Sequence, residues 1–153
     1  MVSPEALKIW PFFGGLSDEV LQPLAAIARR VSLQEGTTIF KENTPAFALY
    51  LLLEGWVDIV LGGEGRDERT ELVTTLTQGD IFGWSAIVEP HIYTASAIAA
   101  TPASALEFPA PDLLALMQAD AGLCYTVMNR TCRVLAARLR ATRTQLVSLF
   151  VDR

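Results

Sequence analysis

The alternation of short β-prone runs and turn residues between positions 31 and 109 restricts the fold of this chain more than any other feature. Six runs recur there: TTIF, FALYLLL, WVDIVLG, ELVTTLT, TASAIAA and SALEF. Turn residues separate them, for example at Asn43–Pro45 and Thr101–Pro102. Many short strands in one small domain are typical of a jelly roll or barrel. We therefore predict a mainly β fold with flanking helices, a double-stranded β-helix, and we interpret GGEGRDER as a polar hairpin loop.

Helical spacing precedes and follows this region. Ser3–Glu5 and Ser17–Glu19 have the sequence of helix starts, and the second helix is predicted to end near Arg29–Arg30. PDLLALMQAD predicts a short helix, and the proline-free remainder of the chain predicts a long one. We expect a single domain over residues 1–153, composed of N-terminal helices (1–30), a jelly roll (31–109), and a short and a long helix (110–153).

The long helix carries an apolar stripe with a 3.5-residue repeat. The stripe consists of Met128, Cys132, Leu135, Leu139, Thr142, Leu146 and Leu149. A helix of this length extends beyond a domain of this size, so we predict that the stripe pairs with that of a second copy, giving a homodimer. A single helix that covers the barrel is the alternative. Because no helix-turn-helix module follows, we expect no nucleic acid binding by this chain alone.

Charge and composition argue against several classes of protein. A net charge of −5 and a pI of about 4.8 disfavour unspecific binding to nucleic acid or anionic membranes. The most apolar segment contains Glu54 and Asp58 and is too short to span a bilayer. The N-terminus has no secretory signal pattern, and Cys124 and Cys132 do not form a disulfide framework. We expect a cytoplasmic protein in which Cys132 packs in the dimer, with an intermolecular disulfide as the alternative.

Four stretches together resemble the cyclic-nucleotide-binding domain, the sensor module of catabolite-activator-type (Crp/Fnr) regulators and of the protein kinase A regulatory subunit. They are FFGGLSDEVLQPLA (12–25), LQEGTTIFKENTPAFALYLLLEGWVDIV (33–60), TQGDIFGWSAIVE (77–89) and YTASAIAATPASALEFP (93–109). The resemblance covers nearly the whole chain. It implies a regulatory domain in which ligand occupancy tilts the C-terminal helices and alters a contact with a partner protein.

In that family the phosphate-binding cassette reads F-G-E-L-A-L, a variable loop, then R-[AST]-A. Helix N–H groups and the arginine hold the cyclic phosphate, and the glutamate accepts from the ribose 2′-hydroxyl. Here Trp84 stands at the glutamate position and Tyr93 at the arginine position. The resemblance implies a ligand site formed by Phe82, Gly83, Trp84, Ser85, Ala86, Tyr93, Thr94 and Ala95.

The absent arginine argues against the usual ligand. No Lys or Arg lies between Arg69 and Arg130, and Asp80 and Glu89 would repel an anion. Burying a phosphate without a cation is unfavourable, so we expect no cAMP or cGMP binding of the usual kind. The exception would be a cation brought in by the fold from Arg29, Lys41 or Arg66. Trp84 and Tyr93 either fill the barrel mouth or line a pocket for an apolar, planar ligand.

The single histidine, His91, is expected to be an exposed loop residue, with a haem ligand as the alternative, because some relatives of this family sense gases through haem. Cupins share the jelly roll, but their catalysis needs several histidines and an acid on a metal. We therefore expect no enzyme activity, no metal and no cofactor. The functional hypotheses are a regulatory sensor domain acting on an unknown downstream protein, a ligand-free interaction scaffold, and the sensor half of a transcription regulator with another small ligand.

Overall fold

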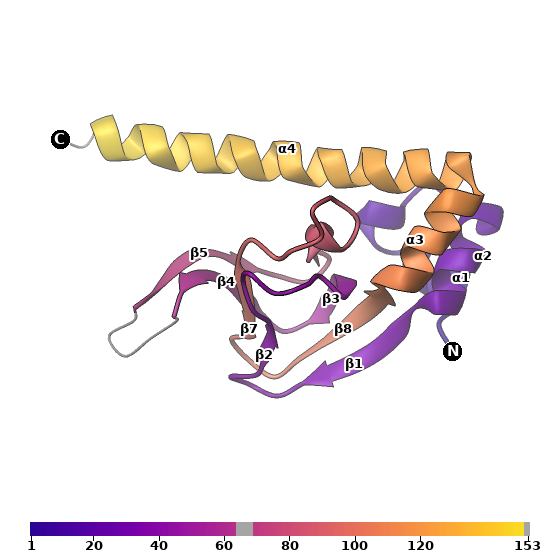
Figure 1. The fold of residues 1–153 in the computed structure, drawn as a ribbon, viewed down its shortest axis with the longest axis horizontal. Coiled ribbons are helices and arrows are strands. Elements are labelled where there is room, and N and C mark those ends of the chain that lie inside the picture. The colour runs from indigo at the N-terminus through magenta and orange to yellow at the C-terminus, as the bar shows by residue number, and fades with distance from the viewer. Residues whose placement is uncertain (64–68, 152–153) are drawn as a thin grey trace. The chain divides into compact units, whose positions relative to one another are not determined.

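A computed structural model describes residues 1–63 and 69–151 of the chain (Figure 1). The chain forms two compact units, Met1–Leu116 and Met117–Arg153, and we describe each by itself. Within the described ranges, no helix combines the length and apolar character needed to cross a membrane.

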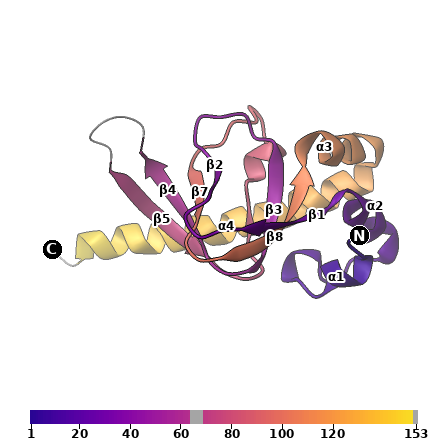
Figure 2. The same ribbon diagram turned by 90° about the horizontal axis from the view of Figure 1, so that it is seen from below.

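Two antiparallel four-stranded sheets form the body of the first unit (Figures 1 and 2). One sheet has the order β1–β8–β3–β6, with β1 Arg29–Leu33, β8 Ala103–Pro109, β3 Ala48–Glu54 and β6 Ile81–Phe82. The other has the order β2–β7–β4–β5, with β2 Thr38–Phe40, β7 Ser96–Ala99, β4 Val57–Gly62 and β5 Thr70–Leu76. Strands that follow one another along the chain often belong to different sheets, so the predicted jelly roll with flanking helices is confirmed.

Strand β3 is buried on both of its faces, which explains its nearly continuous apolar sequence. Tyr50 points into the barrel, because its ring lies beside those of Phe40 and Phe82. Leu49 lies opposite Phe108 on the outer face, and Phe108 contacts Phe13 of the N-terminal segment. The strand therefore contributes to two apolar layers, the barrel interior and the layer beneath the N-terminal helices.

The N-terminal segment forms α1 (Pro4–Lys8), η1 (Pro11–Phe13) and α2 (Asp18–Ile27). As the sequence predicts, Ser3 caps α1 by accepting a hydrogen bond from the Ala6 N–H. The predicted end of the second helix was two residues too late, because α2 ends at Ile27 and Arg29–Arg30 already belong to β1. These two residues pair with β8, and this tertiary pairing overrides their helix propensity.

Strands β4 and β5 pair from Val57 opposite Leu76 to Gly62 opposite Thr70, as a hairpin requires. Residues 64–68 of the predicted GGEGRDER loop lie outside the described residues. Strand β5 is the edge of its sheet and is exposed apart from Leu76.

The second unit begins in the last residues of α3 (Ala110–Ala119) and continues through α4 (Ala121–Val151). Asp120 caps α4, because its Oδ1 accepts from the N–H groups of Gly122 and Leu123. The 31 residues of α4 extend about 46 Å at 1.5 Å per residue. Within the predicted stripe, Met128 and Leu135 are half-buried, and Cys132, Leu139, Thr142, Leu146 and Leu149 are exposed.

Candidate functional site

The segment that resembles the cassette has the backbone that the resemblance implies: strand β6, a glycine turn and η2 (Trp84–Ala86). Gly83 has φ +79°, a conformation that favours glycine. A Cβ at this position would also lie 2.9 Å from the Ala48 carbonyl oxygen. The N–H of Ala86 donates to the Gly83 carbonyl oxygen over 3.1 Å and closes the turn. Both the conformation and the available space therefore require glycine at position 83.

Tyr93 occupies the interior beside this turn and is only 1% exposed. Its hydroxyl donates to the Ala48 carbonyl oxygen (2.7 Å) and accepts from the Ala48 N–H (3.2 Å). Burial is the main cause that raises the pKa of Tyr93 to about 12, although the backbone hydrogen bonds oppose this rise. A neutral phenol bonded to the protein's own backbone thus lies where the resemblance places a cation for the ligand.

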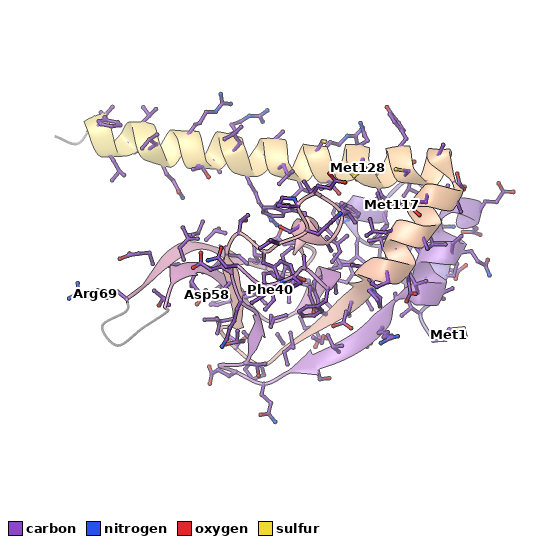
Figure 3. The ribbon with its side chains drawn as sticks, viewed as in Figure 1. Met1, Phe40, Asp58, Arg69, Met117 and Met128 are labelled. Atoms are coloured by element: carbon purple, nitrogen blue, oxygen red, sulfur yellow. The ribbon has the colours of Figure 1, made fainter. Side chains whose placement is uncertain are left out.

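Aromatic rings pack on Tyr93 from two sides. Phe40 stacks on it with 3.7 Å between ring centroids and 11° between planes, and Phe47 meets it edge-on at 5.8 Å. Phe40 also lies 6.1 Å from Phe82, which stacks on Tyr50 at 5.1 Å. Figure 3 shows Phe40 among the side chains that fill the barrel. Phe40, Tyr50, Phe82 and Tyr93 are buried and form a packed part of the core, whereas Phe47 is 48% exposed.

Little space remains within the cassette. The cavity there has a volume of about 30 Å³, enough for about one or two water molecules. Its lining consists of Phe40, Ile59, Phe82, Gly83, Trp84, Ser85, Tyr93, Thr94 and Ala95. Pockets for small ligands usually measure about 300–1,000 Å³. The cassette cavity therefore has about one-tenth of the smallest usual volume of a ligand pocket.

The structure brings seven of the eight predicted site residues into this lining, and the eighth, Ala86, is buried in η2 beside them. Sequence reasoning missed Phe40 and Ile59, which come from β2 and β4. The sequence placed both residues in β-prone runs, which predicts strands but not a position at the cassette. The pairing of β7 with both strands brings them there.

The electrostatics of the barrel interior oppose an anionic ligand. The Tyr50 hydroxyl donates a hydrogen bond of 2.9 Å to Glu107 Oε2. Burial and then the Glu107 charge raise the pKa of Tyr50 far above its usual value, and the same carboxylate contributes to the raised pKa of Tyr93. A phosphate placed here would meet this negative charge.

Of the three basic residues considered as replacements for the missing arginine, the structure describes Arg29 and Lys41, and neither lines this cavity. Arg29 is exposed on β1 and lines a different cavity, and Lys41 is exposed. Arg66 lies outside the described residues.

His91 is half-buried, so its predicted exposure was wrong. Its Nδ1 lies 3.0 Å from the Ser85 carbonyl oxygen, and because a carbonyl oxygen only accepts, Nδ1 carries the proton. The Ala46 N–H donates to the His91 carbonyl oxygen, and the Tyr93 N–H donates to that of Thr44. These bonds tie the 87–93 loop to η2 and to residues 44–46. In the described part of the chain, no group of three or more His, Cys, Asp or Glu side chains could hold a metal ion.

Comparisons with known proteins give matches over most of the chain. The "Cyclic nucleotide-binding domain" family matches residues 30–120. A "CRP-like cAMP-activated global transcriptional regulator" of Mycobacterium tuberculosis is 32% identical over 92% of this chain, which spans 60% of the length of that regulator. The crystal structure of a Geobacter metallireducens protein described as cyclic nucleotide-binding superposes with a TM-score of 0.82 at 34% identity, over 91% of this chain and 99% of that one. The Thermus thermophilus Catabolite Activator Protein superposes with a TM-score of 0.69 at 29% identity, over 91% of this chain and 62% of that one.

Proposed function

Because this chain belongs to the cyclic nucleotide-binding domain family of Crp-like regulators, we propose that it is a regulatory domain whose nucleotide cavity is filled by its own aromatic side chains. In this proposal, Tyr93 and Trp84 replace the arginine and glutamate of the cassette, so the chain does not bind cAMP or cGMP in the usual way. The activity is regulatory rather than catalytic, and it takes place in the cytoplasm.

The observation that carries this proposal is the volume of the cassette cavity, about 30 Å³. A cyclic nucleotide would have to displace Tyr93, which stacks on Phe40 and is bonded twice to Ala48. Breaking these contacts would leave the polar backbone groups of Ala48 unpaired inside the barrel, which costs about 1–3 kcal/mol per group. Among the described residues, no arginine lines the cavity, so no charge-assisted bond to phosphate offsets that cost.

The functional unit that we propose is a single domain over residues 1–153 that dimerises through the stripe on α4 and transmits its state to a downstream protein. The exposed Leu139, Leu146 and Leu149 support this proposal, because large apolar side chains on a helix surface favour burial against a partner. A ligand-free interaction scaffold is the second candidate, and the near absence of free volume in the cassette favours it. A domain that binds another small ligand in the cassette would require Tyr93 to move.

A thermal-shift series with cAMP, cGMP and c-di-GMP tests the proposal. We expect the melting temperature to stay constant across each concentration series, because a ligand raises it only by binding the folded state. A melting temperature that rises with cAMP or cGMP concentration would contradict the proposal that aromatic side chains fill the cassette.

The reverse test restores the family residues with Trp84→Glu and Tyr93→Arg in one variant. We expect this variant to gain affinity for cAMP in calorimetry, because it supplies the guanidinium and the ribose acceptor and removes the ring stacked on Phe40. A folded variant without any gain would contradict the alignment of these two positions with the cassette. Tyr93→Phe is the matched control, since it keeps the ring and adds no charge.

A further inference from the structure

A second cavity, of ligand size, lies in the first unit on the outer face of the sheet that contains β1, β8 and β3. Its volume is about 690 Å³, against about 30 Å³ in the cassette, and it falls within the usual range for small-ligand pockets. Figure 2 shows α1 near β1 and β8, and the walls of the cavity come from the N-terminal segment around α1 and from β1, β3 and β8. The fold thus has room for a ligand outside the cassette.

The wall formed by α1 is held by specific contacts. Leu7 is fully buried, Ser3 caps the helix, and Lys8 forms an ion pair with Asp18 at the start of α2. Trp10 packs against Gly79, where a Cβ would lie 3.5 Å from Trp10 Cε3. Because both ends of this wall are anchored in the same unit, the cavity does not require a ligand to form.

The floor of the cavity is apolar and lies beside an arginine. Leu53 and Leu106 are buried and line the cavity, and Ile9 and Trp10 line the opposite wall. Arg30 pairs with Leu106 in the antiparallel register of β1 and β8, so both side chains project from the same face of the sheet. A cation therefore lies at the edge of an apolar surface.

The charged residues around the cavity indicate the charge of the ligand that it would bind. Arg29 and Arg30 line it, and neither forms an ion pair within residues 1–63 and 69–151. A guanidinium forms bidentate hydrogen bonds with a carboxylate. These bonds orient the carboxylate and also compensate its negative charge. Glu54 also lines the cavity and would repel a ligand with a second negative charge. The lining thus favours one negative group over a polyphosphate.

We propose that this cavity binds a monoanionic organic acid with an apolar body. The carboxylate pairs with the Arg30 guanidinium, and the apolar body lies between Trp10 and the floor formed by Leu53 and Leu106. This site is separate from the cassette and does not depend on whether the cassette binds a nucleotide.

Calorimetry of the full chain with octanoate tests this site, with 1-octanol as the uncharged ligand of the same chain length. We expect saturable one-site binding of octanoate and binding of octanol weaker by about tenfold or more, because the alcohol has no charge for Arg30. Octanoate should also change the fluorescence of Trp10, measured as the difference between the wild type and Trp10→Phe. Equal affinities for the two ligands, or no saturable heat with octanoate, would overturn the proposal.

Two variants locate the binding. Arg30→Gln should weaken octanoate binding by about tenfold, whereas Arg69→Gln, the same change at an exposed position of the β4–β5 hairpin, should leave it unchanged. Ala6→Phe places a ring in the cavity from the exposed side of α1 and should reduce binding without removing a charge. Octanoate affinity that is the same in Arg30→Gln, Ala6→Phe and the wild type would show that the acid binds elsewhere.

Discussion

Tyr93 is neutral and buried, and its ionisation provides a test of the packed cassette. Its pKa is raised to about 12, so the folded protein keeps this proton above pH 10, where the unfolded chain releases it. The folded state then binds more protons than the unfolded state, and the free energy of unfolding falls as the pH rises from about 10 to about 12. The ultraviolet absorbance of ionised Tyr93 should therefore be absent at about pH 10 and appear at higher pH or with unfolding.

Tyr93→Phe identifies this signal, because the variant lacks the ionisable hydroxyl of residue 93. The variant also removes both hydrogen bonds to Ala48 and keeps the ring, so we expect it to lower the free energy of unfolding by about 1–3 kcal/mol for each of the two Ala48 groups left unpaired. An ordinary phenol titration of residue 93 in the folded protein would contradict its burial.

The glycine of the cassette gives a second prediction for a single residue. Gly83→Ala should destabilise the protein more than Gly36→Ala, as measured by urea unfolding. Both positions have positive φ, +79° and +84°, and share the backbone penalty of about 1–2 kcal/mol. A Cβ at Gly83 meets the Ala48 carbonyl oxygen at 2.9 Å, whereas nothing lies within 4 Å at Gly36. Equal losses of stability would show that the close contact relaxes at no cost.

Elements were predictable where local sequence determines them. The helix start at Ser3 and the long α4 follow from capping and from helical periodicity, and the structure has both. The start of β1 was missed because Arg29–Arg30 carries no β signal of its own and becomes a strand through pairing with β8. The two-residue strand β6 likewise exists through its pairing with β3, which no local pattern indicates.

The stripe on α4 yields a prediction about this element. Leu139 is 58% exposed, although it belongs to the apolar stripe of α4. If the stripe pairs with a second copy, Leu139→Glu places a charge in the seam and should weaken the dimer by about tenfold or more in sedimentation velocity. Ala141→Glu adds the same charge to an exposed position outside the stripe and should have little effect. A wild type that sediments as a monomer at all concentrations would contradict pairing through α4.

At the scale of the whole molecule, the cassette depends on contacts between residues far apart in sequence. Tyr93 bonds to Ala48, 45 residues earlier, and stacks on Phe40. Sequence reasoning identified Tyr93 as the altered position, but it left open whether the ring fills the barrel or lines a pocket. That choice depends on which strands meet, and only the folded barrel determines it. The second cavity was not predicted for the same reason, since it combines α1, β1, β3 and β8.

Hydrogen exchange of the whole chain tests whether the exposed part of α4 needs a partner. Every residue from Leu139 to Val151 is exposed, and an isolated helix of this length is only marginally stable in water. In a dimer these amides are protected, so their exchange should slow as the protein concentration rises. The amides of β3, buried within the first unit, should exchange at a rate independent of concentration and serve as the internal control. Exchange of residues 139–151 that stays fast at every concentration would contradict the dimer and favour a monomeric domain.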